Sequence, residues 1–294
     1  MPFVTESTPF LGIISRFAPS PTGRLHLGHA FSAVKAHDLA RANDGHFLLR
    51  IEDIDPGRVR EDHVAGILED LAWLGLTWDG EVVRQSERLP LYAAALDRLK
   101  VAGLLYPCFC TRAEIAASAS APHGNVGPAY PGTCRALSPA EREARMASHP
   151  HCWRLDMTRA LASVNGPLTW HDETAGWIIA DPAAQGDVVL ARKDAPVSYH
   201  LAVTVDDAAQ GVTDIVRGAD LFEATHIHRL LQALLGLPTP SYHHHELLTG
   251  PDGRRLAKRD GAQSLAELRE NGADPVALVE ALRAERLPIA PTKA

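Results

Sequence analysis

The stretch Arg16-Phe-Ala-Pro-Ser-Pro-Thr-Gly-Arg-Leu-His-Leu-Gly-His29 decides how the rest of the chain is interpreted. It follows a short apolar run, residues 10–14, that predicts a buried strand, and it precedes a helical pattern over residues 30–42. The proline and glycine residues between them indicate a turn from the strand into the helix. Such a turn leaves backbone N–H groups at the start of the helix, where an anion can bind.

Two histidines, His26 and His29, lie about one helical turn apart at this predicted helix start. An imidazole can donate a hydrogen bond to a phosphate oxygen whether it is neutral or protonated. The pair therefore predicts a nucleotide site. The alternative is a purely structural turn, because strand–turn–helix units occur in every α/β protein and the chain contains 15 histidines.

Length and composition describe an ordinary globular chain. With 294 residues it can bury an α/β core in one or two domains. The net charge of −7 argues against broad, non-specific DNA binding, although a local basic face can still contact a nucleic acid. No apolar run approaches the roughly 18 residues of a membrane span, and the N-terminus lacks the pattern of a signal peptide. We expect a soluble, cytoplasmic protein with neither membrane nor DNA as a partner.

A second buried strand is predicted at residues 46–51, and an acidic run follows it directly. Polar groups just beyond the carboxyl end of a parallel strand face the ligand crevice of an open sheet. Glu52 is therefore a candidate site residue. A helix N-cap role for the acidic run is the alternative.

The remaining pattern divides the chain into four parts. The two halves of a Rossmann-type parallel nucleotide-binding fold are expected at residues 1–104 and 186–262, separated by an insertion at 105–185 and followed by C-terminal helices at 263–294. Within the second half the expected strands are residues 188–190, 200–205, 212–216 and 242–247, with a helix at 224–235.

Three cysteines in the insertion could meet around one metal ion. Cys108 and Cys110 form a Cys-x-Cys pair, and Cys134 follows after a loop. Three thiolates suit a tetrahedral Zn²⁺, which needs a fourth ligand, and the candidates are Tyr130, His123, Cys152 or a water molecule. Simple burial of small apolar cysteines is the alternative.

A basic segment, Arg254-Arg-Leu-Ala-Lys-Arg259, follows a glycine-containing turn after the last expected strand. This position puts it at the same edge of the sheet as the two histidines. Its Lys258 is a compact charge suited to a departing pyrophosphate, and such charges lower the barrier to phosphoryl transfer.

Four blocks of the sequence resemble class I glutamyl-tRNA synthetases. They are residues 16–23 with His26-Leu-Gly-His29, residues 50–53, residues 216–221, and the basic segment, which resembles the lysine-containing second signature of that family. The basic segment departs from the family's Lys-Met-Ser-Lys-Ser pattern, because Arg255, Ala257 and Arg259 replace the first lysine and the two serines. Lys258 keeps the lysine to which phosphate stabilisation is assigned.

The short C-terminus makes the chain similar to a truncated branch of this family, the glutamyl-queuosine tRNA(Asp) synthetases. Only residues 259–294 follow Lys258, so no anticodon-binding domain is expected. The resemblance implies activation of L-glutamate with ATP and Mg²⁺, without tRNA. It further implies transfer of the glutamate to queuosine in the anticodon loop of tRNA(Asp).

The same resemblance implies a role for individual residues. Arg16 would pair a carboxylate of glutamate through its guanidinium fork, Glu52 would hold the ammonium, and Tyr199 with Arg217 would complete the pocket. The glutamate would lie against Arg16, Phe17, Ala18, Pro19 and Ser20. ATP would contact His26, Gly28, His29 and Lys258, of which His26, His29 and Lys258 would be catalytic. Structural zinc would bind Cys108, Cys110, Tyr130 and Cys134. For Arg217 the alternative is a structural ion pair with Asp214 or Asp220.

Three other functions compete with this interpretation. The first is conventional glutamate–tRNA ligase activity, and the second is nucleotidyl transfer to a small metabolite. The third is a catalytically silent tRNA-binding protein. The glutamate-pocket residues argue against the second function, and the retained His26, His29 and Lys258 argue against the third.

Overall fold

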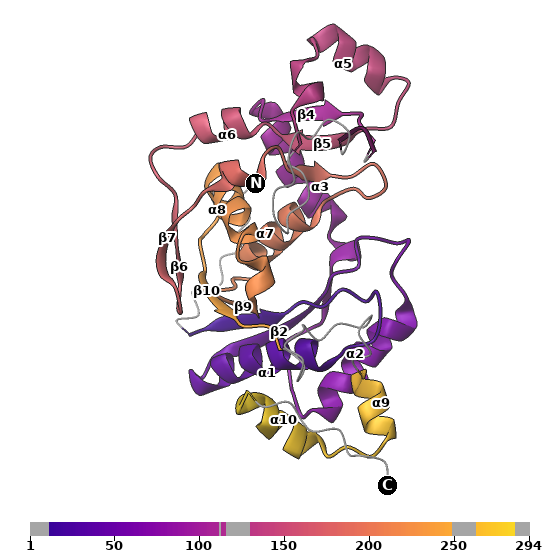
Figure 1. Cartoon of the computed structure of the whole chain (residues 1–294), viewed down its shortest axis with the longest axis vertical. Coiled ribbons are helices and arrows are strands. Elements are labelled where there is room, and N and C mark those ends of the chain that lie inside the picture. Colours follow the sequence, from indigo (N-terminus) through magenta and orange to yellow (C-terminus); the bar gives the residue numbers. More distant parts are fainter. Residues whose placement is uncertain (1–11, 112, 116–129, 249–262, 286–294) are drawn as a thin grey trace.

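A computed structural model describes residues 12–111, 113–115, 130–248 and 263–285 of the chain. Strands and helices alternate along both ends of the sequence, and the strands of the two main ladders are mostly parallel (Figure 1). The predicted α/β fold with a parallel sheet is therefore confirmed.

The first parallel ladder has the order β1 (Ile14–Phe17), β2 (His46–Ile51) and β3 (Val83–Arg84). The second has the order β7 (Gly176–Ile179), β6 (Thr169–Asp172), β10 (Ser241–His245) and β9 (Asp214–Gly218), with β7 as an antiparallel edge. The two ladders meet where the Thr213 N–H donates to the Ile14 carbonyl oxygen over 2.9 Å. This contact brings the ends of β1 and β9 to one crevice.

Helices alternate with the strands of these ladders along the chain. They are α1 (Leu27–Ala42), α2 (Glu61–Trp73), α3 (Leu89–Val101), α7 (Tyr199–Ala209) and α8 (Ala224–Leu235), with short 3-10 turns at Gln85–Glu87, Pro182–Gln185 and Ala219–Leu221. The inner face of α1 is lined with small residues and Phe31, and it packs on the fully buried Phe47 and Leu49 of β2. Strand β2 is buried on both faces, since Phe47, Leu49, Arg50 and Ile51 have no exposed surface.

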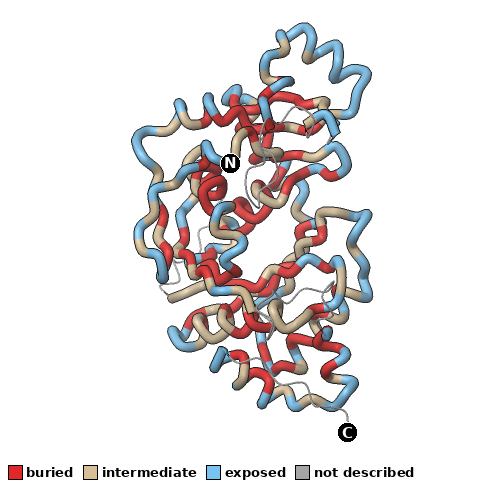
Figure 2. The backbone as a smooth tube through the Cα atoms, viewed as in Figure 1, coloured by how far each residue is buried: buried red, intermediate tan, exposed pale blue. Residues whose placement is uncertain are grey.

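Two strands of the predicted insertion, β4 (Leu105–Cys108) and β5 (Cys152–Leu155), form a separate antiparallel sheet with β8 (Val189–Ala191). The insertion also contains α5 (Pro139–Met146), α6 (Met157–Ala162) and a 3-10 turn at Thr133–Ala136. Helix α5 begins with a capping box between Ser138 and Glu141, as expected from their spacing, and it buries no residue. It lies exposed at one end of the elongated molecule (Figure 2).

Hydrogen bonding crosses the expected boundaries of this insertion. Strands β6 and β7 pair with β10 of the parallel ladder, whereas β8, outside residues 105–185, pairs with β5. The division of the chain into the four parts given above remains a prediction.

The last two helices, α9 (Leu265–Glu270) and α10 (Pro275–Arg283), pack against the first half of the fold. Leu265 and Leu282 are fully buried in the same apolar cluster as α1 and β2. Two ion pairs join α10 and the following turn to α1: Arg283 with Asp38 over 2.7 Å, and Glu285 with Lys35 over 2.8 Å. The final segment of the described chain thus completes the core around β1 and β2.

Two predicted elements are wrong. The expected strand at residues 200–205 is the middle of helix α7, because a short apolar run cannot be distinguished from a buried helix by its pattern alone. The expected strand at 10–14 is shifted, since β1 spans Ile14–Phe17 and residues 1–11 lie outside the described part. The strand at 46–51 and the helix at 224–235 are confirmed. No described helix is long and apolar enough to cross a bilayer.

Candidate active site

A cavity of about 460 Å³ opens at the carboxyl ends of β1, β2 and β9. Its lining brings together the predicted site residues that come from three distant parts of the sequence. These are Arg16, Phe17, Ala18, Pro19, Ser20, His26, Gly28, His29, Glu52, Tyr199 and Arg217. The structure therefore places the predicted glutamate and ATP residues in one pocket, except Lys258, which lies outside the described residues.

The two histidines are locked into the start of α1 by a reciprocal capping box. The Nδ1 atom of His26 accepts from the Gly28 N–H over 3.1 Å, and the His29 Nδ1 atom accepts from the His26 N–H over 3.2 Å. A neutral imidazole that accepts at Nδ1 carries its proton on Nε2. Each Nε2–H is thus a hydrogen-bond donor whose orientation is set by the backbone of the helix start.

Gly28 leaves room for this arrangement. A Cβ atom at this position would lie 3.1 Å from Cε1 and 3.2 Å from Nδ1 of the His26 ring. Both distances are shorter than normal contacts, so a side chain here would push the imidazole away from its cap. The glycine keeps the ring folded over the first turn of the helix.

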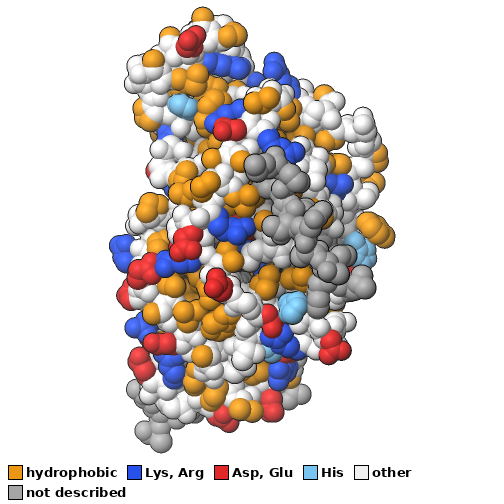
Figure 3. Space-filling view, turned by 180° about the vertical axis from the view of Figure 1, so that it is seen from behind, with side chains coloured by type: hydrophobic (Ala, Val, Ile, Leu, Met, Phe, Trp, Pro, Cys, Tyr) orange, Lys and Arg blue, Asp and Glu red, His pale blue; other side chains and the backbone are white. Residues whose placement is uncertain are grey.

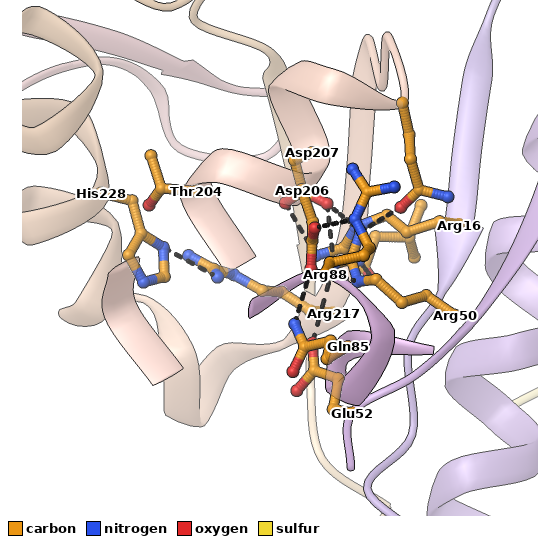
Figure 4. Close-up of polar contacts among 12 residues, drawn as sticks. Arg16, Arg50, Glu52, Gln85, Arg88, Thr204, Asp206, Asp207, Arg217 and His228 are labelled. Carbon is orange, nitrogen blue, oxygen red and sulfur yellow. Dashed lines mark hydrogen bonds and ion pairs between the residues drawn. The ribbon is translucent and has the colours of Figure 1, made fainter. Parts of the chain in front are cut away.

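The pocket floor is a buried network of charges (Figure 4). Asp207 of α7 accepts two hydrogen bonds from Arg16, from Nε over 3.0 Å and from Nη2 over 3.3 Å. The same carboxylate lies 2.9 Å from Nη2 of Arg50, a side chain with no exposed surface. Sequence reasoning missed Asp207, because the wrong strand at 200–205 placed it in a loop. Its partner arginines hold its pKa below the ordinary value, despite its burial.

The neighbouring carboxylate, Asp206, ties α7 to the segment after β3. It accepts from the Gln85 amide over 2.8 Å, from Arg88 Nε over 2.7 Å and from the Tyr92 hydroxyl over 2.7 Å. Because Asp206 is fully buried, each of these donors compensates part of the cost of removing its charge from water.

Glu52 is buried beside two arginines without a bidentate partner. Its Oε1 atom lies 3.6 Å from Nη2 of Arg50, and its side chain is 9% exposed. Burial raises the pKa of Glu52 to about 7, although Arg50 and Arg16 oppose the shift. The N-cap alternative does not apply to Glu52. The next residue, Asp53, instead binds Arg84 and the Ser86 N–H.

Arg217 is buried in a different way, because it forms no ion pair with a carboxylate among the described residues. Its donors contact His244, His228 and Thr225, at 3.1, 3.3 and 2.6 Å. The alternative of a structural ion pair with Asp214 or Asp220 is therefore wrong for this structure. An arginine cannot lose its charge in a protein, so this cation is suited to an anionic ligand.

Several lining residues were missed by sequence reasoning, notably Ser32 and His245. The His245 Nε2 atom lies 2.8 Å from the Ser32 hydroxyl oxygen, and its ring packs edge-on against Phe31. The run of three histidines at residues 243–245, at the end of a strand, was the available signal. Its significance depends on the pairing of β10 with β9, which no local pattern predicts.

The described residues that flank the basic segment both lie at this site. Leu248 lines the cavity, and Ser264, the N-cap of α9, forms an isolated bridge with His26. The Leu265 N–H also donates to the Leu25 carbonyl oxygen over 2.9 Å. The described chain thus stops at Leu248 and resumes just before Ser264, both beside the pocket. The basic segment belongs to residues 249–262, which lie outside the described residues.

On the face opposite to the view of Figure 1, basic and acidic side chains of the described residues are interspersed (Figure 3). The described residues of this face form no broad basic surface, in keeping with the net charge of −7.

The predicted cysteine cluster forms at one end of the insertion. Ligand atoms of Cys108, Cys110 and Cys134 all lie within 4.8 Å of one another, and the Tyr130 hydroxyl oxygen is 3.5 Å from the Cys110 sulfur. Cys152 faces Cys108 across β4 and β5. Hydrogen bonds from Cys152, Tyr130 and Arg154 lower the pKa of the Cys108 thiol, which favours the thiolate that a metal needs. The donor set fits a tetrahedral soft-metal site, and His123 lies outside the described residues.

Comparison with known proteins identifies the fold family. The family model for the catalytic domain of class I tRNA synthetases, E and Q type, matches residues 12–293. The chain belongs to this family. It is a ligase of the aminoacyl-tRNA synthetase type, as the sequence predicted.

Relatives at high identity carry a more specific name. The glutamyl-Q tRNA(Asp) synthetase of Rhodobacter capsulatus is 52% identical over 272 residues, which cover 90% of this chain and 97% of the relative. The protein of the same name from Symbiobacterium thermophilum is 47% identical, covering 91% and 84%. Glutamate–tRNA ligase 1 of Ruegeria pomeroyi is 43% identical and is covered over 59% of its length. The predicted resemblance to the truncated branch is thereby confirmed.

Solved structures agree with the family. A glutamate tRNA ligase from Elizabethkingia meningosepticum, crystallised with its amino acid, superposes with a TM-score of 0.77 at 27% identity. The alignment covers 92% of this chain and 60% of that structure, so the chain spans about three fifths of the solved ligase.

The pKa of Glu52 predicts a pH-dependent contribution to stability. A carboxyl group whose pKa rises from 4.5 to about 7 on folding stabilises the fold below pH 4.5, and this stability is lost as the pH rises through 7. The unfolding free energy of wild type relative to Glu52→Gln should therefore fall by about 1–3 kcal/mol between pH 5 and pH 8. Urea unfolding of both proteins at the two pH values measures this difference in unfolding free energy. A difference that is constant with pH would show that Glu52 keeps an ordinary pKa in the fold.

Proposed function

We propose that this protein activates L-glutamate with ATP in the absence of tRNA and transfers it to the queuosine base of tRNA(Asp). The observation that carries the proposal is the pocket itself. It combines Arg217, a buried cation with no described carboxylate partner, with the buried acid Glu52, next to a helix start that presents two imidazole N–H donors.

The charges of the pocket complement those of a free amino acid with an acidic side chain. Arg16 and Arg50 are balanced by Asp207, and the ionised form of Glu52 can hold an α-ammonium. A substrate carboxylate supplies the counter-charge that Arg217 lacks, through the bidentate geometry that guanidinium groups favour. Tyr199, at the first turn of α7, lines the same wall.

The first step joins glutamate and ATP. The glutamate α-carboxylate attacks the α-phosphorus in line, forming glutamyl-adenylate and releasing pyrophosphate. His26 and His29 donate Nε2–H hydrogen bonds to phosphate oxygens, and Lys258 stabilises the charge that accumulates on the leaving pyrophosphate. Mg²⁺ accompanies ATP as its phosphate-bound counter-ion. The protein's part is orientation and charge stabilisation, because the reaction itself needs no covalent enzyme intermediate.

The second step releases AMP. A hydroxyl group of the queuosine cyclopentenediol attacks the acyl carbon of the adenylate, forms an ester and displaces AMP. The name of the relatives supports queuosine as the acceptor, since those from Rhodobacter and Symbiobacterium are matched over 97% and 84% of their length. A conventional glutamate–tRNA ligase is matched over a smaller share of its length, 59%. Conventional glutamate–tRNA ligase activity is the alternative for the second step.

The acceptor is tested by transfer of radiolabelled glutamate to purified tRNAs. Label should become attached to tRNA(Asp) that carries queuosine and not to tRNA(Asp) that lacks it, because only the modified base offers the cyclopentenediol. Charging of tRNA(Glu) in the same assay would instead establish conventional glutamate–tRNA ligase activity. Pyrophosphate exchange that does not depend on any amino acid would indicate a nucleotidyltransferase.

Lys258→Ala tests the first step. Loss of a positioned charge-stabilising donor should lower the rate of adenylate formation by roughly 10²–10³. Glutamate binding should change little, because Glu52 and Arg217 belong to other parts of the sequence and of the pocket. Transfer from preformed adenylate should be nearly intact, since pyrophosphate has already left. Rapid-quench measurement of both half-reactions, with Lys100→Ala on α3 as the matched control, separates these effects. Adenylate formation at the wild-type rate would move the role to Arg255 or Arg259.

We also propose that the cysteine cluster binds structural Zn²⁺ through Cys108, Cys110 and Cys134, with Tyr130 as the fourth ligand. The mutual distances of the sulfur atoms and the proximity of the Tyr130 hydroxyl to Cys110 support this set. When bound, the ion would hold together the two ends of the segment between β4 and the 3-10 turn at Thr133–Ala136.

Cys110→Ser should abolish zinc binding and loosen the insertion while the parallel ladders survive, because no residue of those ladders belongs to the cluster. The measurements are metal content of protein purified without chelators, and protease sensitivity. Cys152→Ser is the matched control and should retain about one zinc per chain. If Cys152→Ser loses zinc and Tyr130→Phe retains it, Cys152 is the fourth ligand in place of Tyr130. Wild-type protein without zinc would contradict the site.

A further inference from the structure

Every described polar contact of Arg217 is with an uncharged group. Its Nε–H donates to Nε2 of His244 over 3.1 Å, and Nη2 donates to the Thr225 hydroxyl oxygen over 2.6 Å. Its Nη1 atom lies 3.3 Å from Nδ1 of His228. The guanidinium also lies over the Tyr242 ring, 5.2 Å from its centre. Of the five N–H bonds of a guanidinium, these acceptors engage three, which leaves one on each Nη atom.

The proton position on His244 is set from the side opposite to Arg217. Its Nδ1 atom lies 2.8 Å from Oδ2 of Asp172, and both side chains are almost completely buried. An ionised carboxylate can only accept, so Nδ1 carries the proton and Nε2 presents its lone pair to Arg217. Burial, together with the nearby Arg217, lowers the pKa of His244 to about 4, which keeps the ring neutral at physiological pH.

His228 presents a lone pair to Arg217 by the same logic. Because a guanidinium only donates, Nδ1 of His228 must accept, and its Nε2 carries the proton toward Nδ1 of His200 at 3.2 Å. Burial lowers the pKa of His228 well below its ordinary value, and Arg217 adds to the shift. The cage around Arg217 thus accepts hydrogen bonds without neutralising its charge.

We propose that Asp172, acting through His244, is a positioning residue that orients Arg217 for the side-chain carboxylate of the substrate and thereby selects glutamate over glutamine. This inference rests on the proposed function. One N–H on each Nη atom is left for the substrate, and a guanidinium can bind a carboxylate bidentately through its two Nη atoms. Glutamine would leave the buried charge of Arg217 uncompensated, whereas glutamate neutralises it.

Asp172 can be changed so that the tautomer of His244 reverses. Its Oδ1 atom accepts from the backbone N–H groups of Thr174 and Ala175, at 3.0 and 2.8 Å, while Oδ2 accepts from His244. In Asp172→Asn one oxygen becomes an NH₂ group. If the remaining oxygen keeps the two turn N–H groups, the NH₂ group faces both the backbone N–H and Nδ1 of His244. The backbone hydrogen bond is then lost, and the ring must place its proton on Nε2, against the Nε–H of Arg217.

The test is ATP–pyrophosphate exchange with glutamate and with glutamine. In Asp172→Asn the KM for glutamate should rise roughly tenfold or more, since a hydrogen bond to a charged group is lost. The kcat and the KM for ATP should stay within about threefold, because the affected contact lies in the amino-acid pocket. The preference for glutamate over glutamine should fall in parallel.

The outcomes separate the two proposals. Wild-type protein without glutamate-dependent exchange overturns the proposed function and this inference with it. Exchange in the wild type, with an unchanged glutamate KM in Asp172→Asn, overturns the inference alone. A fall in kcat together with similar rises in the KM values for glutamate and ATP would indicate a purely structural role for Asp172. That outcome would also overturn the inference.

A second pair of variants keeps the test decisive if Asp172→Asn does not fold. His244→Gln retains an acceptor oxygen for Arg217, whereas His244→Leu does not, so only His244→Leu should raise the glutamate KM. Equal KM values for the two would contradict the inference. His243→Gln is the matched control, because the neighbouring imidazole pairs with Asp214 instead and should leave glutamate selectivity unchanged.

Discussion

Two buried guanidinium groups of this fold, those of Arg16 of β1 and Arg50 of β2, share one carboxylate, Asp207 of α7. Removing one member of such a buried set costs about 3–5 kcal/mol, because the remaining charges lose their compensation. Since α7 belongs to the second half of the chain and β1 and β2 to the first, this contact also holds the two walls of the pocket in register. The position of Glu52 depends on it through Arg50.

The charges of the arginines in this pocket are compensated in two different ways. Arg16 and Arg50 are neutralised by the protein and define the shape of the floor, whereas Arg217 is surrounded by imidazole, hydroxyl and aromatic groups that leave its charge in place. A buried charge without a counter-ion is costly to a free protein. Such a cost is recovered only when an anionic ligand binds, which ties selectivity to charge more than to shape.

Local patterns in the sequence predicted the helices and strands whose residues carry a strong local signal. The helix at residues 30–42, which the structure extends back to Leu27, the apolar strand at His46–Ile51 and the helix at Ala224–Leu235 are examples. They also predicted most residues of the pocket, because these belong to a recognisable signature. The partners of those residues, such as Asp207 and His244, could not be predicted, since they depend on long-range pairing. The error at residues 200–205 hid Asp207, because a helix and a strand place the following residues on different faces.

The contacts of α9 and α10 with α1 have a consequence for synthesis on the ribosome. The core around β1 and β2 includes Leu265 and Leu282, and α1 pairs with Arg283 and Glu285. The first half of the nucleotide fold therefore exposes part of its apolar surface until these late helices have emerged. Contacts across such long sequence separations slow folding. Throughout translation the nascent N-terminal half is a natural client for chaperones that bind exposed apolar segments.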